Sequence, residues 1–255
     1  MQIDFSKYSS IKIGPILEVR IIEDFEKLKP KENIIGGANN ILISNNPPPL
    51  AMLSSKFDYI HIKDNTLVVG AATKSSKLLT FCKKHNIKNF ELLQKLPGSI
   101  GGLTKMNAGL KEWEIFNHLN YVKTDDKIIK KEDINYSYRH SDIEGIIYEV
   151  GFDIEVGFNN AILGFFKDLR DNQPNNPSAG SCFKNPPNDY AARLIEAVGL
   201  KGKEFGNVSF SKKHANFLVN RGSATYDEAI NLIRIAQKEV RDKFNIELEL
   251  EIQVI

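Results

Sequence analysis

The sequence predicts a fold of the α+β class, in which β-strands and α-helices are mixed along the chain. Up to about residue 150, strand-like runs rich in β-branched residues alternate with short helical patterns. Two clear helices follow, over 189–198 and 225–244, and in the second the apolar residues repeat every three or four positions. A chain of 255 residues with 42% hydrophobic content can bury one large core or two to three small ones.

The strands expected in the first part of the chain occupy 18–22, 33–35, 59–62 and 66–71. Lys63-Asp64-Asn65 separates the last two, and these residues favour a hairpin turn. Later strands are expected over 118–124, 127–130 and 145–156.

Two shorter helices are expected between these strands. The segment from Asp24 to Leu28 predicts a short helix that Pro30 ends. The next helix is expected to be capped near Thr73 or Ser75 and to end at Asn86, because its apolar residues fall on one face.

Charge and cysteine content exclude several classes of protein. Thirty-four Lys and Arg residues against 32 Asp and Glu leave a net charge of +2, too small to predict nonspecific binding to nucleic acid. Cys82 and Cys182 form no Cys-x-x-Cys pair, so neither a disulfide framework nor a metal site is indicated. No apolar run approaches the ~20 residues of a membrane helix, and no export signal begins the chain, so we expect a cytoplasmic protein.

Residues 178–186, Ser-Ala-Gly-Ser-Cys-Phe-Lys-Asn-Pro, combine a hydroxyl, an ammonium and a carboxamide in one short segment. Gly180 permits a positive φ and Pro186 prevents a central strand from continuing, so we expect Ser181 on a bend. Such a cluster suits an oxyanionic ligand beside a proton donor. The alternative is a polar surface turn with a capping serine.

Two glycine-rich segments predict a large phosphate-bearing cofactor, because backbone N–H groups without side-chain obstruction can converge on phosphate. Neither segment has the pattern of a nicotinamide-binding fold or of a P-loop, and tight structural turns are the alternative. The candidate cofactor-binding residues are Gly36, Gly37, Ala38, Asn39, Asn40 and Ile41 in the first segment, and Pro97, Gly98, Ser99, Gly101, Gly102 and Asn107 in the second.

Together these segments resemble the UDP-N-acetylenolpyruvoylglucosamine reductase family over nearly the whole chain. Seven motifs occur in the family's order, at 9–14, 36–43, 97–109, 138–141, 177–186, 213–220 and 244–252. The chain looks like the shorter family type, which lacks the tyrosine-bearing loop over the substrate. Ala38 and Asn39 stand where the family usually has glycine and serine, so individual hydrogen bonds to the cofactor are in doubt rather than the cofactor itself.

The resemblance implies the two-domain FAD-binding fold shared by vanillyl-alcohol-oxidase-like flavoenzymes, plus a smaller α+β substrate-binding domain. It implies FAD-binding subdomains at 1–55 and at 56–170 with 245–255, and a substrate domain at 171–244. It also implies noncovalent FAD and NADPH for reduction of UDP-N-acetylglucosamine enolpyruvate to UDP-N-acetylmuramate, a peptidoglycan precursor. We expect a monomer that binds neither nucleic acid nor membrane.

By the same resemblance, Ser181 is the proton donor, Arg139 pairs with the substrate carboxylate and Glu251 is the acidic group near the developing enol. The remaining positions that match substrate-contacting residues are Tyr138, Lys184, Asn185 and His214. Structural alternatives stay open, because Arg139 could be a solvated strand residue and Glu251 one of several exposed carboxylates on an edge strand. Two other functions are an FAD oxidoreductase of the same fold acting on another anion and a non-catalytic flavin-binding protein.

Overall fold

The computed structural model describes all 255 residues, which form two compact units. The first unit comprises Met1, 19–37 and 49–170, and the second comprises 2–18, 38–48 and 171–255. The division falls within β2 (Ile16–Ile22), whose first part pairs with β1 (Gln2–Asp4) and whose second part pairs with β5 (Leu50–Leu53). The three domain boundaries expected from the sequence stay a prediction.

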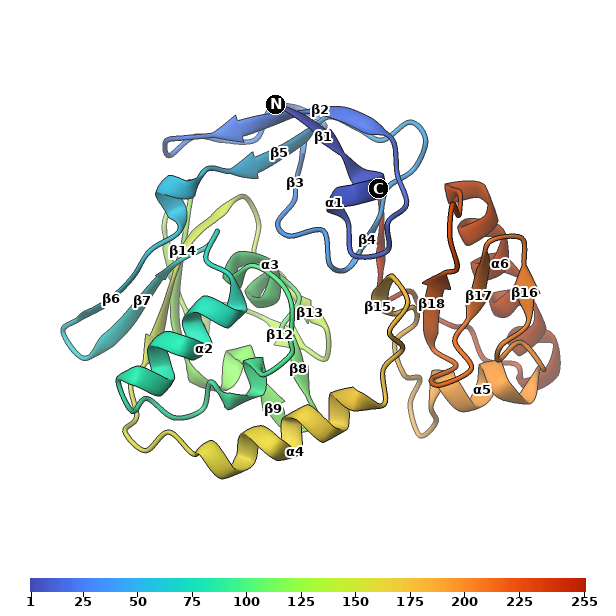
Figure 1. The fold of residues 1–255 in the computed structure, drawn as a ribbon. Helices are drawn as coiled ribbons and strands as arrows, with labels where there is room; N and C mark the ends of the chain where they lie inside the picture. Colours follow the sequence, from blue (N-terminus) through green and yellow to red (C-terminus); the bar gives the residue numbers. More distant parts are fainter. The chain divides into compact units, whose positions relative to one another are not determined.

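A five-stranded antiparallel sheet forms the centre of the first unit (Figure 1). Its strands are ordered β11 (Ile128–Lys130), β10 (Leu119–Thr124), β14 (Ile147–Asp153), β7 (Thr66–Gly70) and β6 (Ile60–Lys63). Helix α3 (Ile100–Lys105) packs against β14 and β7. Asp64 and Asn65 turn the hairpin between β6 and β7 with φ of 46° and 62°, which confirms the expected turn.

The other elements of the first unit surround this sheet. They are β3 (Asn33–Ile34), α2 (Ser75–Lys84), β8 (Gly109–Leu110), β9 (Trp113–Glu114), β12 (Tyr136–Ser137), β13 (His140–Ser141) and α4 (Asn160–Asp171), with 3-10 helices at Ser55–Phe57, Glu91–Leu93, Ile115–His118 and Lys131–Asp133. The core beneath them is rich in phenylalanine, including Phe90, Phe116, Phe152 and Phe166.

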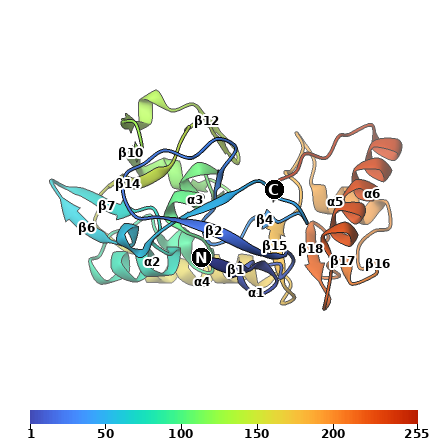
Figure 2. The same cartoon turned by 90° about the horizontal axis from the view of Figure 1, so that it is seen from above.

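The second unit is built on a four-stranded antiparallel sheet ordered β15 (Ser178–Ser181), β18 (Phe217–Asn220), β17 (Val208–Phe210) and β16 (Glu204–Phe205). Helices α5 (Ala191–Ala197) and α6 (Tyr226–Phe244) lie together beside this sheet (Figures 1 and 2). The unit also contains α1 (Phe5–Tyr8) and the parallel pair β4 (Ile41–Leu42) and β19 (Gln253–Val254).

Helix α6 follows its sequence pattern closely. Thr225 and Glu228 form a reciprocal capping box at its start, and Asn245 ends it with a left-handed φ of 56°. The apolar residues of its repeat are buried, namely Ala229, Leu232, Ile233, Ala236 and Val240. The expected helix over 225–244 is therefore confirmed.

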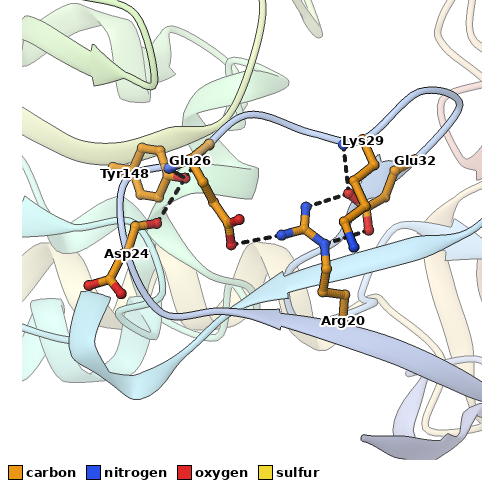
Figure 3. A network of polar contacts seen from close by, with 6 residues as sticks. All are labelled: Arg20, Asp24, Glu26, Lys29, Glu32 and Tyr148. Carbon is orange, nitrogen blue, oxygen red and sulfur yellow. Dashed lines mark hydrogen bonds and ion pairs between the residues drawn. The ribbon is translucent and has the colours of Figure 1, made fainter.

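The prediction of a helix from Asp24 to Leu28 is wrong, because tertiary hydrogen bonds hold this segment as a loop (Figure 3). The Tyr148 hydroxyl accepts from Glu26 N at 2.9 Å and donates to Glu26 O at 2.6 Å. Arg20 lies between Glu26 and Glu32, with its guanidinium 2.7 Å from Glu26 and its Nε 2.8 Å from Glu32 Oε1. These bonds occupy backbone groups that a helix would need for itself.

Two further differences concern helices. Lys74 occupies the N-cap position of α2 without a side-chain capping bond, and the expected cap at Thr73 or Ser75 is wrong, because the Thr73 hydroxyl donates to Tyr59 O at 3.1 Å and the Ser75 hydroxyl to Leu96 O. Helix α4 was not predicted, since Gly164 lies near its middle and weakens the helical signal. None of the helices is both long enough and apolar enough to cross a membrane.

Candidate active site

Ser181 ends β15 beside a β-bulge. Strands β15 and β18 pair at Ser178 with Val219 and again at Ser181 with Phe217, so β15 holds one extra residue between the two pairs. Gly180 lies in this bulge with φ of 87°, a conformation that suits glycine. The bulge provides the bend expected from Gly180, although Ser181 belongs to a short strand rather than to a turn.

Glu251 lies beside Cys182, the residue that follows Ser181. Glu251 N donates to Cys182 O at 2.9 Å, and Glu251 O accepts from Asn40 Nδ2 at 2.9 Å. Burial and, to a smaller extent, the charge of Glu251 raise the pKa of the Cys182 thiol. Ser181 and Glu251, far apart in sequence, are thus brought onto adjacent backbone segments.

The side chains of Lys184 and Asn185 are held by protein partners in the same unit. Lys184 Nζ lies 2.7 Å from Glu249 Oε1, and Asn185 Oδ1 accepts from Ala191 N, the first residue of α5, at 3.1 Å. Glu249 is exposed, so water screens this ion pair. Their contact with substrate stays a prediction.

His214 lies in the turn that precedes β18, where Phe217 N donates to His214 O at 3.0 Å. Asn216 N donates to His214 Nδ1 at 3.3 Å, so the neutral ring carries its proton on Nε2. Burial lowers the pKa of His214, which favours this neutral form. The ring packs edge-on against Phe217, with centroids 4.9 Å apart.

Arg139 lies in the first unit, on the two-residue connection between β12 and β13. Ser137 pairs with His140, which leaves Tyr138 and Arg139 at the tip of the hairpin. Arg139 has φ of 57°, a strained conformation for a residue with a Cβ. Its guanidinium donates to Gly109 O at 2.9 Å and lies 4.7 Å from the centre of the Tyr138 ring. The alternative of Arg139 as an ordinary strand residue is therefore wrong.

A second arginine near Arg139 was not found by sequence reasoning. Arg170, at the end of α4, is buried and donates to Gln94 O and Leu92 O, both at 2.8 Å. Burial and the positive charge of Arg139 lower the pKa of Arg170 to about 10. Two guanidinium groups within electrostatic reach of each other favour an anion nearby. No sequence motif marks Arg170.

Asn107 and Lys105 hold the hairpin that carries Arg139 through hydrogen bonds to its backbone carbonyls. The fully buried Asn107 donates to Glu114 Oε2 at 2.8 Å and to Ser137 O at 3.1 Å, and it accepts from Phe116 N at 3.3 Å. Lys105 Nζ donates to the carbonyls of Ile143 and Ser141, and burial lowers the pKa of Lys105. Asn107 therefore shapes the hairpin that carries Arg139, and its contact with a cofactor stays a prediction.

The two glycine segments meet inside the first unit. A Cβ built on Gly36 would lie 2.3 Å from Ser99 Oγ, although the two residues are far apart in sequence. A Cβ on Gly101 would lie 2.8 Å from Ala71 Cβ. Ser99 caps α3 through Gly102 N at 3.4 Å. Gly36 and Gly101 therefore lie against the side chains of Ser99 and Ala71 with no room for side chains of their own, and glycine-rich backbone of this kind fits a site for a phosphate-bearing cofactor.

The remainder of the first glycine segment lies in the second unit. Ala38 has φ of 49°, which explains why glycine suits this position. Ser10 N donates to Ala38 O at 3.1 Å and the Ser10 hydroxyl to Asn39 O at 3.1 Å. Ile41 begins β4 and pairs with Gln253. The other candidate residues Gly37, Pro97 and Gly98 lie in the loops of the first unit.

Comparisons with known proteins agree with the motifs. Residues 173–255 match the family model of the UDP-N-acetylenolpyruvoylglucosamine reductase C-terminal domain. A UDP-N-acetylenolpyruvoylglucosamine reductase of Helicobacter hepaticus is 46% identical, covering 99% of this chain and 98% of its own. One of Campylobacter jejuni is 44% identical over the whole of both chains. The crystal structure of a UDP-N-acetylenolpyruvylglucosamine reductase from Thermus caldophilus superposes with a TM-score of 0.87 at 28% identity, covering 100% of this chain and 98% of that one, which confirms the expected fold.

Proposed function

The chain belongs to the UDP-N-acetylenolpyruvoylglucosamine reductase family, and from this premise we propose how its residues divide the work of the reaction. It reduces the enolpyruvyl group of UDP-N-acetylglucosamine enolpyruvate to give UDP-N-acetylmuramate. We assign NADPH as the hydride source, FAD as a noncovalent cofactor and the cytoplasm as the compartment. A monomer suffices for this proposal.

The residues of the glycine segments fit FAD. Position 36 has no room for a side chain beside Ser99 Oγ, and the backbone N–H groups of such glycine-rich segments are the groups that bind a pyrophosphate in this proposal. Neither segment contains the histidine or cysteine that a covalent flavin link would need. FAD held by these segments would supply the redox chemistry, taking up hydride from NADPH and delivering it to one carbon of the enolpyruvyl double bond.

Ser181 supplies the proton that completes the reduction. Its hydroxyl protonates the second carbon of the double bond, and solvent restores the proton to Ser181 afterwards. Arg139 holds the substrate carboxylate through a planar guanidinium that can make two parallel hydrogen bonds, and the charge of Arg170 adds to this anion-binding potential. Glu251 forms a hydrogen bond to the enol as charge develops there.

The observation that carries this proposal is the hydrogen bond from Glu251 N to Cys182 O, which places Glu251 beside the segment that begins at Ser181. Anaerobic rapid mixing tests it. FAD-loaded protein should be bleached by NADPH and recoloured by UDP-N-acetylglucosamine enolpyruvate. Reduction without recolouring would contradict the assignment of UDP-N-acetylglucosamine enolpyruvate as the substrate. Flavin retained by the acid-denatured chain would contradict noncovalent binding.

A further inference from the structure

Asn216 has a buried carboxamide that is bonded entirely to the segment following Ser181. The residue is 3% exposed and directly precedes β18. Its Oδ1 accepts from Phe183 N at 3.0 Å, and its Nδ2 donates to Phe183 O at 2.7 Å. Its backbone oxygen accepts from Cys182 N at 2.7 Å. One residue thus fixes three consecutive peptide groups, 181–182, 182–183 and 183–184.

This pairing continues the sheet where the backbone ladder stops. Strands β15 and β18 last pair at Ser181 and Phe217, and the Asn216 side chain then offers Phe183 the donor and acceptor that a strand backbone would supply. A carboxamide makes the two bonds from two separate atoms, whereas a hydroxyl has a single oxygen for both and an ionised carboxylate has no donor. The type of side chain at position 216 is therefore set by geometry.

The opposite edge of the same segment holds Glu251. Cys182 O accepts from Glu251 N, Lys184 N donates to Glu249 O at 2.8 Å, and Phe183 bridges Leu250 in antiparallel register. Residues 182–184 therefore run as a rib between Asn216 on one side and the segment 249–251 on the other. A shift of residues 182–184 would displace Ser181, which is covalently joined to Cys182, and Glu251, which is hydrogen-bonded to Cys182.

We propose that Asn216 is a positioning residue for the reductase reaction. Its carboxamide sets the register of residues 182–184 and, through them, the relative placement of the Ser181 hydroxyl and the Glu251 carboxyl. This inference rests on the proposed function, because it requires Ser181 and Glu251 to act on the same substrate. Asn216 itself stays buried and contacts no reactant.

Asn216→Asp tests the proposal with little change of shape. The ionised carboxylate cannot donate to Phe183 O and repels it, whereas the protonated acid restores the donor, and burial favours the protonated form. At high pH, reoxidation of the reduced flavin by UDP-N-acetylglucosamine enolpyruvate should fall by roughly 10²-fold, the effect of a displacement of about 1 Å. The rate should return toward that of the parent as pH falls, while reduction by NADPH stays near the parent rate throughout.

Each rate is taken as a ratio to the parent protein at the same pH. The other titratable groups around the rib are the same in both proteins, so their effects cancel; they are Cys182, Lys184, His214, Glu249 and Glu251. Asn216→Ser removes the carboxamide but leaves a small polar side chain. This second variant should be slow at every pH, because no titration can restore the missing pair of bonds.

Asn220→Asp is the matched control. Asn220 ends β18, is 4% exposed, and donates to Ile11 O at 3.1 Å and Lys12 O at 3.0 Å, away from the rib. It should lower the melting temperature about as much as Asn216→Asp but leave reoxidation near the parent rate. Parent-like reoxidation in both Asn216 variants, or equal slowing in the control, overturns the positioning role. A parent protein that the substrate cannot reoxidise overturns the proposed function and, with it, this inference.

Discussion

The contact between the two glycine segments gives a prediction that can be tested without substrate. Gly36→Ala places a methyl group 2.3 Å from Ser99 Oγ, roughly 1 Å inside ordinary contact. Gly36 has no left-handed φ, so alanine brings no backbone strain. The cost of the substitution therefore arises from Ser99, whose hydroxyl must leave its bond with Gly102 N.

The magnitude follows from three contributions. Overpacking costs about 1–3 kcal/mol, which includes the loss of an N-cap of about 1 kcal/mol. Gly-to-Ala substitution returns about 0.4–1 kcal/mol by restricting the unfolded chain. Gly36→Ala should thus destabilise the protein by up to about 2.6 kcal/mol. In a Ser99→Ala background the nearest remaining atom is Ser99 Cβ at 3.4 Å, so the same change should be neutral or stabilising.

Thermal unfolding and FAD titration of the four proteins of this double-mutant cycle measure the coupling. A coupling of about 2 kcal/mol corresponds to roughly 4–8 °C in a chain of this size. The affinity for FAD should fall by roughly tenfold in Gly36→Ala and recover in the double variant, since the shifted loop is relieved. Gly164→Ala, in open space on α4, should stabilise the fold without changing FAD affinity. Additive effects of the two changes would refute the close approach of the segments.

The remaining predictions concern the site and a distant ion pair. Ser181→Ala should be reduced by NADPH near the parent rate but be reoxidised by the substrate at least ~10²-fold more slowly, with Ser181→Cys retaining more activity; reoxidation at the parent rate would assign the proton to water or to Glu251. Arg139→Ala should slow reoxidation far more than reduction, and equal loss in both steps would instead indicate a damaged flavin site. The hydrogen bond from Arg20 lowers the pKa of Glu32, so this pair stabilises the fold above the ordinary pKa of a glutamate and loses its effect as pH falls through the lowered pKa. Glu32→Gln should therefore reduce the free energy of unfolding by about 1–3 kcal/mol at pH 7, and a denaturant series would contradict this if the difference did not shrink in acid.

Elements whose signals are local could be predicted from the sequence. The capping box and the apolar repeat of α6 lie within the helix itself, and the Asp64-Asn65 turn needs only its own left-handed residues. The helix prediction for Asp24 to Leu28 was wrong for the opposite reason, because the conformation of this segment depends on Tyr148, more than a hundred residues away. Tertiary hydrogen bonds of this kind leave no periodic trace in the sequence.

The candidate site shows the same division. Ser181 could be singled out because Gly180 and Pro186 leave a local pattern around it, whereas Arg139 was found only through the resemblance to the family. Arg170 could not be found, since its importance depends on the approach of α4 to the carbonyls of Leu92 and Gln94. The position of Glu251 was found only through the order of motifs, because nothing near it in sequence distinguishes it from Glu249.

A polar residue within a ligand-binding motif can either contact the ligand or hold the loop that does so, and the sequence alone does not separate these two roles. A loop that exposes backbone to a ligand gives up regular hydrogen bonds, and buried side chains must replace them. Asn107 and Asn216 replace such bonds, since the oxygen and the nitrogen of each carboxamide are hydrogen-bonded to protein groups. Ser181 ends the bulged strand next to the residues that Asn216 holds, and Arg139, which has a left-handed φ, lies on the hairpin that Asn107 holds. Under the proposed roles of Ser181 and Arg139, the buried asparagines hold the backbone that carries the reacting side chains, so a substitution at either should slow the chemistry by displacing its neighbours.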